Sequence, residues 1–195
     1  MVTVEVLDVP VAQASQRLAA DEADVAIGSV GTSPALATLL RTELLARDRL
    51  VAVYARGRAP RAPASGRGMK WRALQNAEVI LTDRISGQWR EVFLQLSRAG
   101  VVLHAVQEVR LYSTALEMVR CGLGMTLLPA FAARHLDASH YDVRGIGHRD
   151  TSWEVHWMTR AGSVPTAAME ALRAATAEAL APDRGRRYAT SGSDR

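Results

Sequence analysis

The stretch that most constrains the fold of this chain is LYSTALEMVRCGLGMTLLP, residues 111–129. Its first half carries apolar residues at the three-and-four spacing that places them on one face of a helix. These residues are Tyr112, Ala115, Leu116 and Val119. Ser113 or Thr114 is predicted to cap the helix, because a hydroxyl can accept from the free backbone N–H groups of the first turn.

The second half of this stretch predicts a glycine turn that leads into a strand. Gly122 follows the last apolar helix position, where a left-handed residue often ends a helix. Gly124 comes next, and residues 125–128 form a short apolar run that Pro129 ends. The two glycines do not form a dinucleotide fingerprint, because Leu127 occupies the third glycine position and that fingerprint follows a strand and opens a helix. The glycines therefore indicate a tight helix-to-strand turn.

Length and composition indicate a soluble globular protein. The chain has 195 residues, of which 48% are hydrophobic and 23% charged. No apolar run approaches the roughly 20 residues that span a bilayer, and the N-terminus lacks the pattern of a secretory signal. The one cysteine, Cys121, rules out an internal disulfide framework and fits a reducing cytoplasm. Cys121 is expected to be a small buried hydrophobe.

The net charge of +4 would permit contact with nucleic acid. The excess is largely arginine in two loop-like places, residues 56–67 and 183–195. Neither place has interleaved aromatic residues or a recognisable recognition helix. Both are therefore interpreted as solvated loops.

The first part of the chain has the pattern of a strand–helix–strand unit. Residues 2–7 alternate apolar and polar side chains, residues 11–22 have helical spacing, and residues 24–27 form a short buried strand. Such a unit favours a parallel sheet. A further strand is predicted at residues 50–54, followed by a loop over residues 55–68.

The middle of the chain alternates strands and helices and predicts a second α/β lobe. The expected elements are a helical turn at residues 71–74, a strand at 79–81, a helix ending at Gly100, a strand at 104–109 and, after the glycine turn, a short helix at 131–136.

The last part predicts a strand, a helix and a tail. Residues 152–159 alternate, with Trp153, Val155 and Trp157 on one side. Ser163 and Pro165 are expected to start a helix that Pro182 ends. The inner face of that helix is Met169, Leu172, Thr176 and Leu180. The Gly-, Ser- and Arg-rich residues 182–195 are expected to be disordered.

Two segments resemble the effector-binding domain of LysR-type transcriptional regulators. One is Val119-Arg-Cys-Gly122-Leu-Gly124-Met-Thr-Leu-Leu-Pro129, which matches the family's Val-x-x-Gly-x-Gly segment and the strand after it. The other is residues 18–27, which match a Leu-x-x-Gly-x-Leu-Asp-x-Ala-Ile region, with Asp21 in place of the turn glycine. Asp tolerates such a turn. The resemblance extends over about residues 2–180.

The resemblance implies an α/β, two-lobed periplasmic-binding-protein-like (type 2) fold with two crossover strands and an incomplete first lobe. The first lobe would comprise residues 1–54 plus 150–181, and the second lobe residues 55–149. No internal sequence repeat relates the two lobes.

No set of residues points to catalysis, so we expect no catalytic residue, no cofactor and no metal. The chain lacks the Gly-x-Ser-x-Gly nucleophile elbow. His135 and His140 are the closest pair of histidines, with no cysteine or carboxylate set at zinc spacing. Both are expected on the surface.

A small-molecule site is better supported than an active site. In parallel α/β sheets, ligands lie beyond the carboxyl ends of strands, near helix N-termini that favour anions. Three predicted strand ends carry hydroxyl or charged side chains, and the family binds its effector between the lobes through loops of this kind. The effector-binding candidates are Ser29, Thr82, Asp83, Arg84, Ser86, Ser113 and Thr114.

The resemblance also implies partners and a cellular location. The expected partner is a small, polar or anionic effector in a cytoplasmic, bacterial-type regulator that is a homo-oligomer, with no membrane contact. The family's N-terminal winged helix-turn-helix is absent before residue 2, so the chain is expected to be a fragment that contacts DNA only through that missing part. Without the family's first strand, the first lobe is expected to be unstable or self-associating.

Two other classes of protein share this fold. A solute-binding protein of a transporter is disfavoured by the missing signal segment, and an enzyme is disfavoured by the missing catalytic set. The upstream reading frame would discriminate between the regulator and the transporter component.

Overall fold

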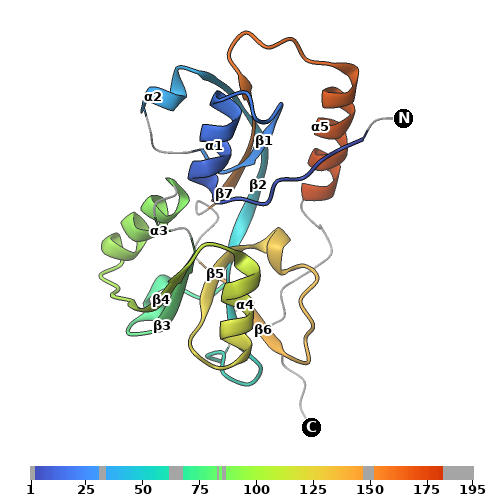
Figure 1. The fold of residues 1–195 in the computed structure, drawn as a ribbon. Helices are drawn as coiled ribbons and strands as arrows, with labels where there is room; N and C mark the ends of the chain where they lie inside the picture. The colour runs from blue at the N-terminus through green and yellow to red at the C-terminus, as the bar shows by residue number, and fades with distance from the viewer. Residues whose placement is uncertain are drawn as a thin grey trace. The chain divides into compact units, whose positions relative to one another are not determined.

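The computed structural model describes residues 3–30, 34–61, 68–82, 84, 87–146 and 152–181 (Figure 1). The chain forms two compact units. Unit 1 comprises Met1–Arg47, Ile85–Gln88 and Glu154–Pro182, and unit 2 comprises Asp48–Arg84, Trp89–Trp153 and Asp183–Arg195. The strands β2 and β7 each contribute residues to both units.

Unit 1 is built on a sheet with the strand order β1, β7, β2. Its elements are α1 (Val11–Ala19), β1 (Ala26–Gly28), α2 (Pro34–Ala37), the first half of β2 (Leu40–Ala55), most of β7 (Ser152–Arg160) and α5 (Ala167–Leu180). β1 and β7 are antiparallel, with Ile27 opposite Trp157. The parallel sheet predicted for this part of the chain is therefore wrong, because the strand that returns from the C-terminal region lies next to β1.

The strand predicted at residues 2–7 is not formed over residues 3–7. Val6 is 80% exposed and Val4 is also exposed. The alternation supplies an apolar face, but a strand also needs a hydrogen-bonded neighbour. No strand of the described residues pairs with this segment.

Helix α1 packs on the sheet through Leu18, which contacts Ala26 and Met158 in one buried cluster. The helix ends at Ala19, three residues before the predicted end. Asp21 then has a φ of +63°, which confirms that an aspartate makes this turn in place of a glycine. Arg160 fixes the turn, because its guanidinium lies 2.7 Å from the Asp21 carboxylate.

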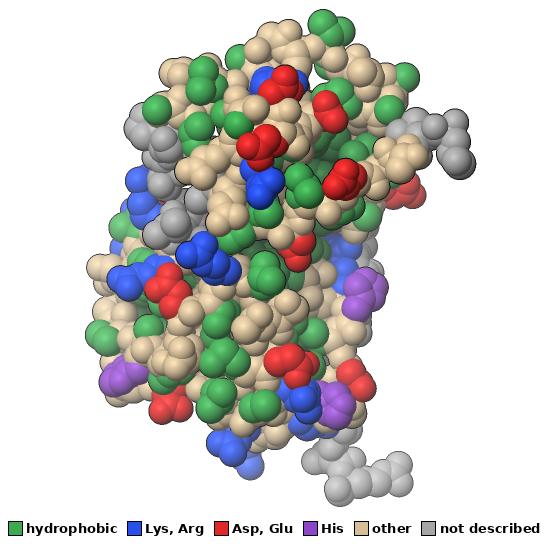
Figure 2. All heavy atoms as spheres, viewed as in Figure 1, with side chains coloured by type: hydrophobic (Ala, Val, Ile, Leu, Met, Phe, Trp, Pro, Cys, Tyr) green, Lys and Arg blue, Asp and Glu red, His purple; other side chains and the backbone are tan. Residues whose placement is uncertain are grey.

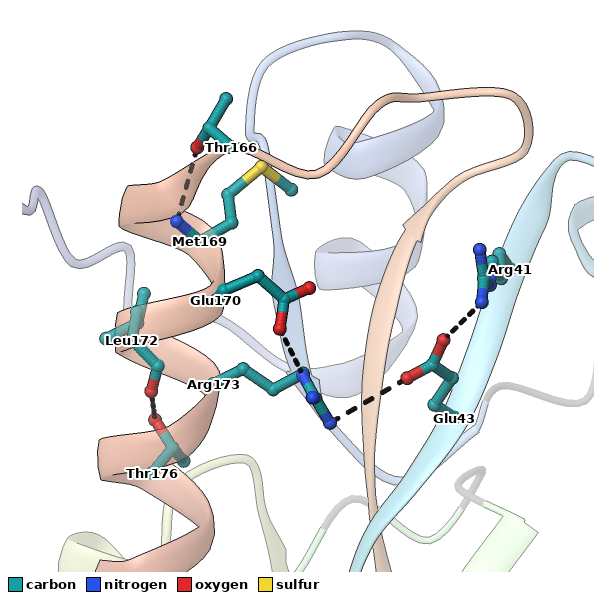
Figure 3. A network of polar contacts seen from close by, with 8 residues as sticks. All are labelled: Arg41, Glu43, Thr166, Met169, Glu170, Leu172, Arg173 and Thr176. Atoms are coloured by element: carbon teal, nitrogen blue, oxygen red, sulfur yellow. Dashed lines mark hydrogen bonds and ion pairs between the residues drawn. The ribbon is translucent and has the colours of Figure 1, made fainter.

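Helix α5 begins at a hydroxyl cap, although not at the predicted residue. Thr166 accepts a hydrogen bond from the Met169 N–H at 3.2 Å (Figure 3). The Ser163 hydroxyl instead donates to the Arg160 carbonyl oxygen. No residue of α5 is fully buried. The predicted inner face, Met169, Leu172, Thr176 and Leu180, is half-buried.

Ion pairs connect α5 to β2. Arg173 contacts Glu170 in its own helix at 3.2 Å and Glu43 of β2 at 4.0 Å, and Glu43 also pairs with Arg41 (Figure 3). Because these side chains are partly exposed, each pair contributes only about 0–1 kcal/mol. The chain of pairs therefore orients α5 on the sheet more than it stabilises the unit.

Unit 2 contains two separate sheets. Its elements are the second half of β2, η1 (Trp71–Leu74), β3 (Glu78–Thr82), most of α3 (Gly87–Arg98), β4 (His104–Val109), α4 (Tyr112–Arg120), β5 (Thr126–Pro129), η2 (Ala130–Ala133), β6 (Tyr141–Gly145) and the start of β7. The helical turn at 71–74, the strand at 104–109 and the helix before Gly100 are confirmed. Strand β6, helix α2 and the first half of β2 were not predicted.

In the first of these sheets, β2 pairs antiparallel with both β5 and β6, and in the second, β3 pairs parallel with β4. A bridge between Val79 and Met125 connects the two sheets. Val51 and Val53 of β2 lie in one buried cluster with Ala115 and Val119 of α4. Tyr112 and Leu116 pack against the same cluster, which confirms the predicted inner face of this helix.

The turn after α4 forms as the sequence predicts. Gly122 has a φ of +80° and Gly124 a φ of +149°, and a Cβ on Gly124 would lie 2.9 Å from the carbonyl oxygen of Glu78. Only glycine therefore allows the backbone to approach β3 this closely. The expectation that Cys121 is buried is wrong: it follows the last helical residue and is exposed.

Candidate functional site

The carboxyl ends of β3 and β4 lie side by side. The parallel register places Thr82, the last residue of β3, opposite Val109, the last residue of β4. Helix α4 begins three residues after Val109. The structure therefore brings Thr82 to the same sheet edge as the start of α4, which is the arrangement that favours a ligand site in parallel sheets.

Ser113 and Thr114 lie in the first turn of α4 and are exposed. The prediction that one of them caps the helix is wrong, because the N-cap residue is Leu111, which makes no side-chain cap bond. The helix starts earlier than a hydroxyl cap at residue 113 or 114 would require. Both hydroxyls thus occupy helical positions and face solvent beside the sheet edge.

Thr82 has the most unusual environment of the candidates. Its side chain is 1% exposed, and its hydroxyl has no hydrogen-bond partner. A buried polar group left without a partner costs about 1–3 kcal/mol. In native proteins such groups are few, and each indicates a bound water, a strained site or a ligand contact.

A second partnerless buried group lies on α3, the helix that follows β3 in sequence. Trp89 is 0% exposed, and its indole N–H has no partner. In the sequence, Trp89 is part of the apolar stripe of a predicted helix, and it is not among the predicted site residues. The signal that was available is that a buried tryptophan usually needs an acceptor for its N–H.

The remaining candidates are less informative. The Arg84 guanidinium lies 5.9 Å from the centre of the Phe93 ring, a cation–π distance, and Arg84 is exposed. Asp83 and Ser86 lie outside the described residues. Ser29 is buried and follows β1, so it belongs to unit 1, whereas Thr82, Arg84, Ser113 and Thr114 belong to unit 2.

Other polar groups in unit 2 have perturbed surroundings without forming a catalytic set. Burial raises the pKa of Tyr54 to about 12, with the Arg144 charge acting in the opposite direction. The Tyr54 hydroxyl and the Arg144 Nε are both buried without partners. His135 and His140 are exposed, as predicted. Within the described ranges, no group of three or more His, Cys, Asp or Glu residues is placed to hold a metal ion.

The charges do not form a basic surface on the face drawn in Figure 2, where Lys and Arg side chains lie interspersed with Asp and Glu. In the arginine-rich loop, Arg56 is paired with Asp142 at 2.9 Å. In the part of the chain that the structure describes, no helix is both long and apolar enough to span a bilayer.

Comparison with known proteins identifies the family. The family model for LysR substrate binding domains matches residues 1–181. This chain belongs to the LysR substrate binding domain family. The recognition made from the glycine turn and from residues 18–27 is confirmed, and so is the two-lobed, type 2 periplasmic-binding-protein-like fold that the resemblance implied.

One curated relative is similar in sequence, and solved structures of LysR family proteins are similar in fold. The HTH-type transcriptional regulator YfeR of Shigella flexneri is 39% identical over 62 residues, which cover 32% of this chain and 20% of YfeR. The LysR family regulator CbnR has a TM-score of 0.66 at 16% identity, over 89% of this chain and 58% of CbnR. The regulatory domain of CcmR from Synechocystis PCC6803, in complex with 2-PG, has a TM-score of 0.67 at 16% identity, over 90% of this chain and 81% of that one.

The chain therefore spans about a fifth of the curated relative that it matches and 58% of CbnR.

Proposed function

We propose that this chain is the effector-sensing part of a LysR-type transcriptional regulator and has no catalytic activity of its own. A small molecule would bind to it and change how an oligomer of the whole protein presents its DNA-binding segments. Family membership over residues 1–181 supports this proposal. The structural neighbours include the CcmR regulatory domain in complex with 2-PG and the effector binding domain of QuiR in complex with shikimate.

One observation carries the choice of site: the buried, partnerless hydroxyl of Thr82 at the carboxyl end of β3. We infer that a polar group of the effector supplies the missing hydrogen bond. Since Thr82 is closed to solvent, the effector reaches it only after the chain around it opens. The free N–H groups and the dipole of nearby α4 favour an anionic or strongly polar ligand, with Ser113 and Thr114 as further donors.

Isothermal titration calorimetry tests this assignment, with a panel of small carboxylates and phosphates that begins with 2-PG and shikimate. For a compound that binds, Thr82→Val is expected to weaken the affinity about tenfold, because one hydrogen bond to a charged group contributes about 1.5 kcal/mol. Ser97→Ala is the matched control, since Ser97 is exposed near the other end of α3. Unchanged affinity in Thr82→Val would contradict the site.

The whole regulator's DNA recognition is proposed to lie outside residues 1–195, and its action to be cytoplasmic. The arginines of this chain can give only salt-sensitive contact with nucleic acid. Sequence-selective retention of a promoter fragment by this chain at physiological salt would overturn that part of the proposal. Hydrolysis or transfer chemistry on the bound effector would instead favour an enzyme on the same fold.

A further inference from the structure

Two neighbouring strands carry the chain from one unit to the other. In β2 the boundary falls between Arg47 and Asp48, and in β7 it falls between Trp153 and Glu154. The two strands are adjacent in the sheet. Arg47 and Glu154 are therefore the unit 1 residues next to the two crossings.

These two residues form an ion pair across 107 positions of sequence. The Arg47 Nε donates to Glu154 Oε1 at 2.9 Å. The other carboxylate oxygen, Oε2, lies 3.5 Å from the Nε2 of His156, two residues further along β7. One carboxylate is thus shared between a permanent cation on β2 and a titratable ring on β7.

On the other side of the boundary, β2 is anchored to unit 2. Asp48 is buried, and its carboxylate accepts from the backbone N–H groups of Arg49 and Phe131. Two successive residues of β2 therefore have partners in different units. Arg47 contacts Glu154 in unit 1, and Asp48 contacts Phe131 in unit 2. The crossing in β2 therefore lies between two residues that are each held by contacts within their own unit.

His156 is poised to remain neutral until the pH falls. Burial lowers the pKa of His156, the Glu154 charge raises it, and the Arg47 charge lowers it. The Nδ1 of the ring is buried without a partner, so a second ring proton would have no acceptor. Because its pKa lies below the usual 6.5, the ring is largely uncharged at neutral pH.

On β1, on α1 and at Arg160 of β7, no charged side chain is free to act on His156. β1 has no charged side chain, and its Gly28 lies opposite His156. Arg17, the one charged residue of α1, pairs with Glu22 at 3.2 Å, and Arg160 of β7 pairs with Asp21. Glu154 and Arg47 are the charged groups that shift the pKa of His156.

We propose that Glu154 is a proton-sensitive clasp on the two strands that join the units. When His156 is neutral, Glu154 holds Arg47 and ties β7 to β2 at the crossing. When His156 takes a proton from solvent, the imidazolium competes for the same carboxylate and repels Arg47, so the clasp loosens. This input goes beyond effector sensing and does not depend on which effector binds.

Proton NMR of the imidazole ring tests the electrostatic half of the proposal. The His156 signal is identified by its loss in His156→Gln. Its titration midpoint is expected to rise in Arg47→Gln, which removes a repelling cation, and to fall in Glu154→Gln, which removes an attracting anion. A midpoint that neither substitution moves would overturn the shared-carboxylate arrangement.

Electron–electron distance measurements test the conformational half. Spin labels are attached at Ala175→Cys in unit 1 and Arg98→Cys in unit 2, in a Cys121→Ser background, because all three positions are exposed. The distance distribution is expected to broaden as the pH falls through the His156 midpoint, to be broad at every pH in Arg47→Gln and Glu154→Gln, and to be independent of pH in His156→Gln.

The matched control is Arg56→Gln. Arg56 pairs with Asp142 at 2.9 Å and is 62% exposed, against 63% for Arg47, but its pair lies at the far end of β2, away from the two crossings. The control should behave like the wild type, and Arg47→Lys, which keeps the charge, should retain the pH response. A distribution that does not change with pH while circular dichroism reports folded protein, or a control that broadens like Arg47→Gln, would overturn the clasp.

Discussion

The hydroxyl of Thr126 donates to the carbonyl oxygen of Ile80 at 2.9 Å, and thereby connects β5 to β3 through a side chain where the two strands share only one bridge. Two residues further along β3, Thr82 is equally buried and its hydroxyl has no partner. Both threonines are therefore buried, but only the Thr126 hydroxyl has a hydrogen-bond partner.

This difference predicts opposite effects of the same substitution. Thr126→Val is expected to lower the free energy of unfolding by about 1–3 kcal/mol, because it leaves the Ile80 carbonyl buried without its donor. Thr82→Val should leave stability unchanged or raise it by about 1 kcal/mol, since it removes a hydroxyl that has no partner. Urea unfolding of both variants without ligand measures the contrast. Equal destabilisation would mean that the Thr82 hydroxyl is bonded in solution.

The glycine turn predicts which of two glycine substitutions destabilises the protein more. Gly124→Ala should destabilise unit 2 more than Gly122→Ala, because only the first places a Cβ 2.9 Å from a backbone oxygen. Gly122→Ala is expected to cost about 1 kcal/mol, from its left-handed φ alone. Thermal unfolding of the two variants gives the comparison, with Gly57→Ala as a control for positive φ in open space. The reverse order would contradict the close approach to β3.

The buried hydroxyl of Tyr54 predicts a loss of stability in alkali. Its pKa is raised to about 12 by burial, from 10.0, so between these pH values the unfolded chain has lost a proton that the folded chain keeps. Stability should therefore fall as the pH rises, by about 1.4 kcal/mol per pH unit at most. Tyr54→Phe should abolish this part of the slope in urea unfolding at pH 10 to 12.

Comparing Tyr141→Phe with Tyr54→Phe at pH 7 separates the loss of a hydrogen bond from the removal of a buried hydroxyl that has no partner. Tyr141 donates to the Leu116 carbonyl oxygen at 3.2 Å, so Tyr141→Phe should cost about 1 kcal/mol. Tyr54→Phe should cost nothing, since its hydroxyl has no partner. A destabilised Tyr54→Phe would reveal a bond that forms in solution.

The unpaired N-terminal segment predicts uneven protection against hydrogen exchange. Amides of residues 3–7, which have no ladder partner, should exchange near the unprotected rate, whereas those of β3 and β5 should exchange slowest. Strong protection of residues 3–7 in a monomer of this chain would contradict the structure.

The sequence predicted elements well where the signal was local. The strand at 104–109 and the helix, turn and strand at 112–129 follow from side-chain period and glycine placement, and both were confirmed. Strand β6 was missed because Asp142, Arg144 and Gly145 give it little apolar pattern. The first half of β2 was missed because many of its side chains are exposed, and exposure on both faces removes the alternation.

The errors in unit 1 have a non-local cause. Whether β1 is parallel to its neighbour depends on β7, which is more than 120 residues away in sequence, and no local pattern reports that pairing. For the site, the strand-end rule selected Thr82 and the start of α4, and the parallel register of β3 and β4 brings them to one edge. That the Thr82 hydroxyl and the Trp89 indole lack partners depends on packing in three dimensions, so no sequence pattern could reveal it.

The 16-residue strand β2 has a consequence for how the chain can change length. In unit 2 its odd-numbered Val51 and Val53 pack in the cluster beneath α4, while Leu50 and Ala52 are also buried. In unit 1 the odd-numbered Glu43 reaches Arg173 of α5. Because side chains alternate along a strand, inserting one residue after Arg47 would exchange the two faces in one unit while leaving the other unit unchanged. Inserting two would keep both. At this point of β2, insertions or deletions of two residues therefore keep the direction of the side chains in both halves of the strand, whereas changes of one residue do not.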